Sequence, residues 1–229
     1  MDIALAIMVK QPTPGWVKTR LCPPLTPEDA AELYRCFLLD KMAQVQRVGA
    51  AVHYLAFTPQ KAEQFFRGLA GASFSLVAQT GSNLGQRLDR LSTELLAARH
   101  PGVVIIDSDT PNLPDKYLAE AVERLADGRT EAVFGPAEDG GYYLVGLTRP
   151  SPALFQGITW STPVVLKQTL EKAASAALRV HLLRPWFDVD TGADLDRLRC
   201  QLVADGTLAD HTRAFLERPV GGYPERNPA

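Results

Sequence analysis

Short apolar runs alternate along this chain with segments whose apolar residues recur at helical spacing. The clearest runs, at residues 3–9 and 102–106, are apolar almost throughout rather than at every second position. A strand that is apolar on both of its faces is typical of a parallel sheet covered by helices on both sides. The pattern therefore predicts an α/β protein built on a mostly parallel sheet.

The same reading gives a full set of expected elements. Strands are expected at residues 3–9, 52–57, 74–77, 102–106, 132–134, 142–147 and 180–183. Helices are expected after Thr26, near Pro59, from Leu84, and at 115–125, 164–177 and 192–203. No repeat or long linker divides the chain, so we expect one domain over residues 1–218. Residues 219–229 are rich in Pro, Gly and charge, and we expect a loosely ordered end.

Composition excludes several classes of protein. With 22% charged residues and a formal net charge of −2, the chain offers no broad basic surface for nucleic acid. The apolar opening at residues 3–9 is too short to cross a bilayer and lacks the flanks of a signal peptide. Three cysteines without a CxxC pair favour a reducing compartment. We expect a cytoplasmic protein with no membrane and no nucleic-acid partner.

A basic loop follows the first predicted strand. It contains Lys10, Lys18 and Arg20, with Gly15 between them. Loops at the carboxyl ends of strands are the usual ligand sites of α/β folds, and these cations could neutralise a diphosphate. Gly15 would let the backbone approach the ligand closely. The alternative is an ordinary solvated basic loop.

Two acidic strings are candidates for a metal site. Asp107-Ser108-Asp109 ends the predicted strand at 102–106, where carboxylates could hold Mg²⁺ or Mn²⁺ against substrate phosphates. Asp188 and Asp190 alternate in an extended segment, so they share one side of it. The alternatives are an Asp-rich turn for the first string and a helix cap for the second.

A glycine-rich string at residues 135–143 lies between two predicted strands. Glu138 or Asp139 could act as a general base on an acceptor hydroxyl, and Gly140 and Gly141 would hold the backbone close to a ligand. The alternative is a Gly-Gly hairpin turn, which is compatible with the first interpretation.

Taken together, these strings resemble a known family of GT-A-type transferases. The matching strings are KQPTPGWVKTRL at 10–21, QTGSNLGQR at 79–87, DTPNLP at 109–114, GPAEDGGYYLVGL at 135–147, WST at 160–162 and DVDTGADL at 188–195. In this order they resemble the selenodomain-associated transferases, some of which are called arsenosugar biosynthesis glycosyltransferases. The resemblance extends over nearly the whole chain up to about residue 200. Asp107 departs from it, because the family usually has glycine there.

The resemblance implies a nucleotide-diphospho-sugar transferase fold, a three-layer α/β/α sandwich. It implies that the 10–20 loop embraces phosphates, that Gln79 with its neighbours lines a base pocket, and that uridine is the base. The residues expected to bind the nucleotide are Lys10, Gly15, Gln79, Gly81, Gly85, Arg87, Gly140 and Gly141. The expected catalytic residues are Lys18, Arg20 and Asp139, and the expected ligands of Mg²⁺ or Mn²⁺ are Asp109 and Asp190.

These expectations define a metal-dependent transferase that moves a sugar from a nucleoside diphosphate to a small-molecule acceptor. Lys18, Arg20 and the metal would stabilise the diphosphate leaving group. One alternative is a nucleotidyltransferase that acts on a nucleoside triphosphate and releases pyrophosphate. A second alternative is a nucleotide-binding protein without catalytic activity.

Overall fold

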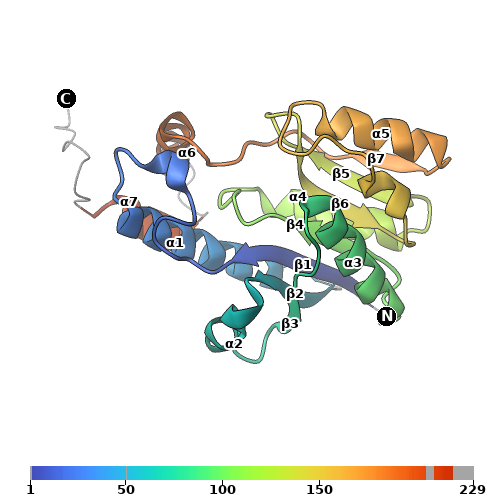
Figure 1. Ribbon diagram of the computed structural model, residues 1–229, viewed down its shortest axis with the longest axis horizontal. Helices are drawn as coiled ribbons and strands as arrows, with labels where there is room; N and C mark the ends of the chain where they lie inside the picture. Colours follow the sequence, from blue (N-terminus) through green and yellow to red (C-terminus); the bar gives the residue numbers. More distant parts are fainter. Residues whose placement is uncertain (1, 50, 205–208, 219–229) are drawn as a thin grey trace.

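The computed structural model describes residues 2–49, 51–204 and 209–218. Its centre is a 7-stranded sheet in the order β3-β2-β1-β4-β6-β5-β7 (Figure 1). The strands are β1 (Ile3–Lys10), β2 (Ala51–Thr58), β3 (Ser75–Ala78), β4 (Val103–Ile106), β5 (Ala132–Pro136), β6 (Tyr142–Leu147) and β7 (Val180–Leu182). All neighbouring strands run parallel except β6, which is antiparallel to both β4 and β5. The predicted mixed, mostly parallel sheet is confirmed.

Helices cover both faces of this sheet. They are α1 (Pro27–Gln46), α2 (Glu63–Ala70), α3 (Leu84–Ala97), α4 (Asp115–Ala126), α5 (Val165–Ser175), α6 (Gly192–Ala204) and α7 (Asp210–Leu216). Short 3-10 helices lie at η1 (Thr19–Leu21), η2 (Gln60–Ala62) and η3 (Pro152–Phe155). Helix α7 was not expected from the sequence, and residues 219–229 lie outside the described residues.

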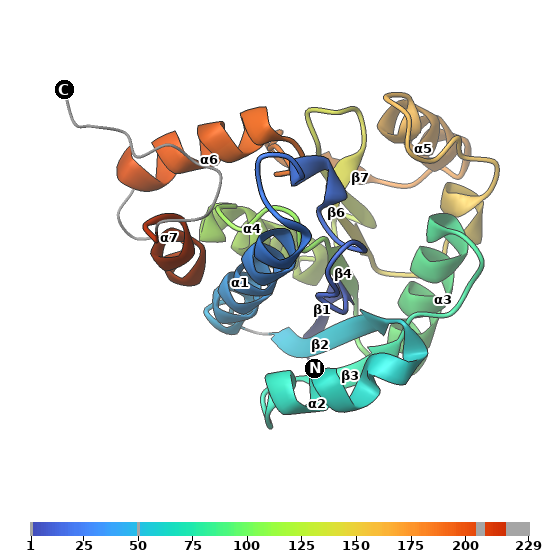
Figure 2. The ribbon, with the colours of Figure 1, turned by 60° about the vertical axis from the view of Figure 1, so that its left-hand side comes forward.

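The alternation of side chains along β1 explains the three layers. Ile3, Leu5, Ile7 and Val9 pack into one apolar core with α1, α2, α4, α6 and α7. The intervening small side chains of β1 pack on the other face, in a second core with α3, α5 and η3. Figure 2 shows the two groups of helices on opposite sides of the sheet. The expected three-layer sandwich is confirmed.

Local sequence signals set the beginnings of two helices. Thr26 caps α1 by accepting a hydrogen bond from the Asp29 backbone N–H at 3.1 Å, as its capping sequence predicts. At α6, the Thr191 backbone N–H and hydroxyl both donate to the Asp194 carboxylate at 2.7 Å. This contact fixes the chain directly after Asp190, so the cap interpretation of this string is confirmed.

A tight turn links β5 to β6 and carries the glycine-rich string. Gly140 has a φ of +91°, and a Cβ added to it would lie 2.2 Å from the Pro163 carbonyl oxygen. The Gly140 carbonyl also accepts a hydrogen bond from the Leu166 backbone N–H at 2.9 Å, in the first turn of α5. The hairpin interpretation is therefore confirmed, and Gly140 holds this turn against the start of α5.

Replacing Gly140 by alanine is expected to destabilise the protein more than the same change at Gly128. Gly128 has a φ of +72° but open space around its Cβ position, so G128A measures the backbone strain alone, about 1–2 kcal/mol. G140A adds the steric conflict with Pro163 and is expected to lower the free energy of unfolding by at least about twice as much. Urea unfolding of the two variants checks this; equal losses would contradict it.

Candidate functional site

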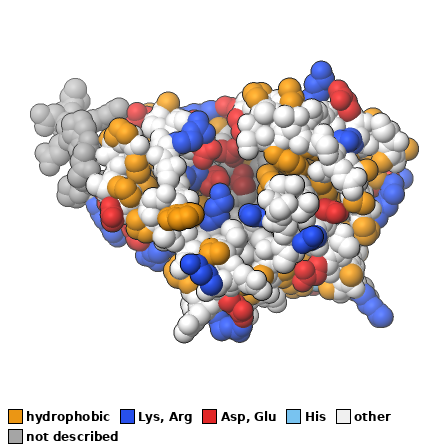
Figure 3. All heavy atoms as spheres, viewed as in Figure 1, with side chains coloured by type: hydrophobic (Ala, Val, Ile, Leu, Met, Phe, Trp, Pro, Cys, Tyr) orange, Lys and Arg blue, Asp and Glu red, His pale blue; other side chains and the backbone are white. Residues whose placement is uncertain are grey.

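The carboxyl ends of β1 and β4 meet at one edge of the sheet, where a cleft opens. The cleft has a volume of about 510 Å³. Figure 3 shows acidic side chains gathered in a hollow on this face, with basic side chains close by. The residues that line the cleft include Lys10, Trp16, Lys18, Arg20, Tyr34, Gln79, Arg87, Asp107, Asp109, Tyr142, Ser161 and Asp190. Most of the predicted site residues therefore share one cavity.

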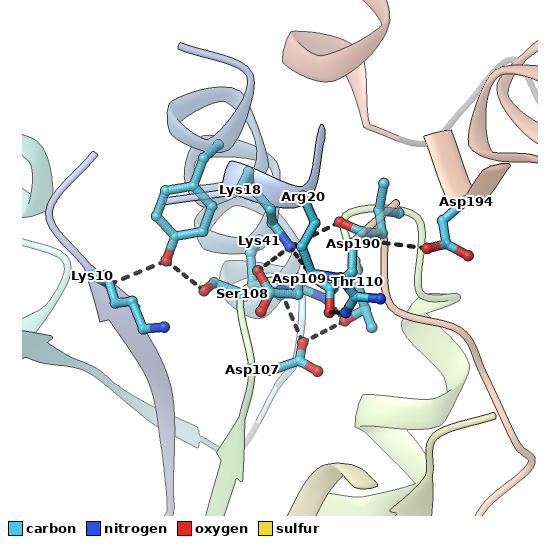
Figure 4. Close-up of polar contacts among 12 residues, drawn as sticks. Lys10, Lys18, Arg20, Lys41, Asp107, Ser108, Asp109, Thr110, Asp190 and Asp194 are labelled. Atoms are coloured by element: carbon cyan, nitrogen blue, oxygen red, sulfur yellow. Dashed lines mark hydrogen bonds and ion pairs between the residues drawn. The ribbon is translucent and has the colours of Figure 1, made fainter. Parts of the chain in front are cut away.

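Lys18 is the central cation of this cleft (Figure 4). Its Nζ lies 2.5 Å from Asp109 Oδ1 and 2.9 Å from Asp190 Oδ1, and it donates to the Val189 carbonyl at 2.8 Å. Its side chain is only 4% exposed. Burial by itself lowers the pKa of Lys18, but the two carboxylates outweigh burial, so the pKa lies well above its ordinary value. Lys18 is therefore a permanent cation held between the two predicted metal ligands.

The segment before α6 reaches this site by crossing beside the turn after β4. The Val189 backbone N–H donates to the Asp109 carbonyl at 2.9 Å, and Phe187 and Val189 are buried while Asp188 and Asp190 point the other way. Arg20, which is mostly exposed, lies 3.6 Å from the second oxygen of Asp190. Asp109 and Asp190 therefore both contact the Lys18 ammonium, and their role as metal ligands stays a prediction.

Tyr34 on α1 ties the ends of β1 and β4 together. Its buried hydroxyl accepts from the Lys10 backbone N–H at 3.1 Å and shares a hydrogen bond with Ser108 Oγ at 2.8 Å. Burial, together with the charge of Asp109, raises the pKa of Tyr34 far above its ordinary value, so the hydroxyl stays neutral. Both strand ends are thus fixed at the mouth of the cleft.

Asp107 and Asp188 form a second pair of acids behind the first. Asp107 Oδ1 accepts from the Asp109 backbone N–H at 3.1 Å and from the Thr110 hydroxyl at 2.8 Å. Burial raises the pKa of both Asp107 and Asp188. The charge of Asp109 raises the pKa of Asp107 further, and the charge of Asp107 raises the pKa of Asp188 further. Asp188 Oδ1 is buried and has no hydrogen-bond partner among the described residues. Two acids so close and so dry favour holding a proton between them.

A fully buried lysine, Lys41 on α1, lies beneath these acids. Its ammonium donates to the Thr110 carbonyl at 2.6 Å, to the Thr110 hydroxyl at 3.0 Å and to Gln44 Oε1 at 2.8 Å. Burial lowers the pKa of Lys41 to about 8, and nearby carboxylates, Asp107 first among them, oppose that shift. Sequence reasoning missed this residue, because a lone lysine among apolar helix positions gives no local sign that it is buried.

The residues at 79–87, which were expected to bind the base, have two different roles: some line the cleft and one packs against a neighbouring helix. Gln79 lines the cleft, and its Nε2 donates to the carbonyls of Ala56 at 2.7 Å and Val9 at 3.2 Å, which leaves Oε1 available to accept. Arg87 also lines the cleft and donates from Nε to the Gly81 carbonyl at 3.2 Å. Gly85 instead packs under η3: a Cβ there would lie 2.5 Å from the Phe155 carbonyl oxygen. Its glycine is thus required by helix packing.

Six predicted residues lie outside the cleft lining: Gly15, Gly81, Gly85, Asp139, Gly140 and Gly141. Asp139 is exposed in the turn after β5, and its Oδ1 accepts from the Gly141 backbone N–H at 2.8 Å. Its charge nevertheless contributes to raising the pKa of Asp188. Gly140 holds the turn described above, and Gly15 has a φ of +76° in an exposed bend of the basic loop. Their ligand-binding roles stay predictions.

Comparison with known proteins places the chain in a family. The model of the family described as an uncharacterized protein conserved in bacteria (DUF2064) matches residues 41–162, more than half of the chain. The chain belongs to the DUF2064 family. No functionally curated protein matches it.

Solved structures confirm the fold. A protein from Desulfovibrio desulfuricans G20, provisionally named a nucleotide-diphospho-sugar transferase, is 33% identical over 94% of both chains, with a TM-score of 0.87. CMP:2-keto-3-deoxy-manno-octonic acid synthetase in complex with CTP has a TM-score of 0.57 at 10% identity, covering 90% of this chain and 100% of the other. Molybdopterin-guanine dinucleotide biosynthesis protein A from Archaeoglobus fulgidus has a TM-score of 0.54 at 13% identity, covering 88% and 100%. The fold is that of the nucleotide-diphospho-sugar transferases.

Among the described residues, no helix is long and apolar enough to cross a membrane. The same residues contain no group of three or more His, Cys, Asp or Glu side chains arranged to hold a metal ion.

The lowered pKa of Lys41 predicts a specific pH dependence of stability. Between pH 8 and 10.5 the unfolded chain binds the Lys41 proton and the folded protein does not, so folding becomes more favourable as pH rises through this window. Relative to K41M, the wild type is expected to gain up to about 3 kcal/mol across it. Urea unfolding in EDTA measures this difference.

The matched control is K61M, since Lys61 lies exposed on η2. It should follow the wild type at every pH. If the free energy of unfolding of K41M changed with pH in parallel with that of the wild type, burial would not lower the pKa of Lys41.

Proposed function

We propose that this protein is a metal-dependent transferase that takes a sugar from a nucleoside-diphosphate donor and passes it to a small-molecule acceptor. The observation that carries the proposal is the cleft itself, in which the cations of the 10–20 loop face Asp109 and Asp190. The similar Desulfovibrio protein, matched over nearly its whole length, bears the name of this class of enzyme.

The carboxylates present suit a hard divalent cation such as Mg²⁺ or Mn²⁺. The Lys18 ammonium already lies between Asp109 and Asp190, so the space between them accepts a positive charge. Mg²⁺ in transferases is commonly held by one or two carboxylates together with substrate phosphates and water. Asp109 and Asp190 would supply the protein ligands. When bound, the metal would neutralise charge that develops on the diphosphate leaving group.

Different side chains of the cleft are placed to contact the phosphates and the base of the donor. Lys10 and Arg20 are exposed cations at the mouth, placed to contact phosphate oxygens, and Arg87 adds a third from α3. The fixed amide of Gln79 presents an acceptor, which can pair with an N–H group on the edge of a base such as uracil. Cations in contact with the diphosphate would stabilise the charge that develops on it as it leaves. Asp139 stays the predicted base for the acceptor hydroxyl.

Metal-dependent nucleotide binding tests the site. UDP with Mn²⁺ is expected to raise the melting temperature of the wild type, since a ligand at about 100 times its Kd adds about 2.7 kcal/mol of stability. D109A and D190A should each lose this increase. D196N, a change at an exposed position of α6, should keep it. An unchanged increase in D109A would remove the metal assignment.

The products distinguish the two kinds of transfer. With Mn²⁺ present, slow release of the nucleoside diphosphate from a UDP- or GDP-sugar is expected, because water can replace a missing acceptor. Release of pyrophosphate from a nucleoside triphosphate and a phosphorylated acceptor would instead show nucleotidyl transfer. A protein that binds nucleotides but releases neither product with any of them would be a binding protein only.

A further inference from the structure

Lys18 lies in the space that the proposed function gives to the metal, and it is also expected to contact the diphosphate. Its ammonium fills the space between Asp109 and Asp190, with all three of its hydrogens directed at oxygens of Asp109, Asp190 and Val189. In this position it can neither contact a phosphate nor leave room for a metal between the carboxylates. The metal site and the phosphate contact of Lys18 therefore belong to a different arrangement of this side chain.

The charges around this point are already balanced. Asp109 and Asp190 contribute two negative charges, and Lys18 and Arg20 contribute two positive charges within 3.6 Å of them. A divalent cation entering this neutral group would gain little attraction and would meet the ammonium at close range. Without Lys18, the same carboxylates would carry a net negative charge and attract it.

The backbone on both sides of Lys18 is anchored, so a change of partner by its ammonium does not require the loop to move. Val17 and Leu21 are buried on either side of Lys18, and the Leu21 backbone N–H donates to the Lys18 carbonyl at 2.9 Å. The flexible four-carbon stem of a lysine allows its ammonium to swing from one oxygen group to another. Lys10 and Arg20 line the same cleft, so a phosphate held there would lie within the region that Lys18 borders.

We propose that Lys18 and the divalent metal are mutually exclusive occupants of the space between Asp109 and Asp190. In the nucleotide-free protein, Lys18 occupies it and keeps the metal out. An entering diphosphate gives the ammonium a new partner, and the two carboxylates then become available to the metal. Nucleotide and metal thus bind with positive coupling, and by linkage each strengthens the other. This inference rests on the proposed function.

The test is Mn²⁺ binding without nucleotide, measured from the electron paramagnetic resonance signal of free Mn²⁺. K18M removes the charge and keeps most of the length of the side chain. It is expected to bind Mn²⁺ more tightly than the wild type, on the order of tenfold, because one positive charge has left the site. K61M, which removes an exposed lysine elsewhere, should match the wild type. Adding D190N to K18M should abolish the gain.

The outcomes separate this inference from the proposed function. Equal or weaker Mn²⁺ binding by K18M would overturn the inference, while UDP-dependent Mn²⁺ binding by the wild type would still support the metal site. If neither protein bound Mn²⁺ with or without UDP, both the inference and the metal site would be wrong.

A measurement on the wild type tests the inference without relying on the folding of K18M. The buried ammonium of Lys18 should give a slowly exchanging signal in a ¹⁵N correlation spectrum of lysine side chains. Addition of Mg²⁺ alone is expected to leave this signal in place, and Mg²⁺ with UDP should shift or remove it. A signal unchanged by Mg²⁺ with saturating UDP would show that Lys18 never leaves, and would overturn the inference.

Discussion

The ion pairs of Lys18 join three segments that lie far apart in the chain. The basic loop after β1, the turn after β4 and the strand-like segment before α6 each contribute one side of the contact. A buried charge is costly to leave alone, and removal of one partner of such a pair typically costs about 3–5 kcal/mol. The shape of the cleft therefore depends on an electrostatic contact that its proposed ligands are expected to rearrange.

Helix α1 supports this edge of the sheet from behind with polar side chains. Tyr34 fixes the two strand ends, and Lys41 fixes the turn that carries Asp107 and Asp109. The residue before Lys41, the buried Asp40, accepts hydrogen bonds from the backbone N–H groups of His211 and Thr212 at the start of α7. Buried polar side chains fix the relative position of neighbouring segments better than apolar side chains do, because each polar group needs a particular hydrogen-bond partner. Helix α1 thus lies behind the cleft and holds the strand ends and the turn after β4 in position.

Much of this could be predicted from the sequence. The apolar runs at β1 and β4 fix a buried parallel pair, and polar residues directly after two such strands must meet at one edge, which brings Lys10 near Asp109. The antiparallel direction of β6 follows from the tight Gly140–Gly141 turn. The burial of Lys41 and the capping of α7 by Asp40 depend on partners distant in sequence, which local patterns do not reveal. Likewise, Gly85 looks like a ligand-binding glycine until η3 is seen to lie against it.

We propose that a metal lies between Asp109 and Asp190 only when a nucleotide is bound. Anomalous scattering from crystals grown with UDP and Mn²⁺ tests this most directly. We predict one manganese peak bound by both carboxylates, with the Lys18 ammonium turned to a phosphate oxygen of UDP. A structure with UDP in the cleft, no manganese at these carboxylates and Lys18 still between them would contradict it.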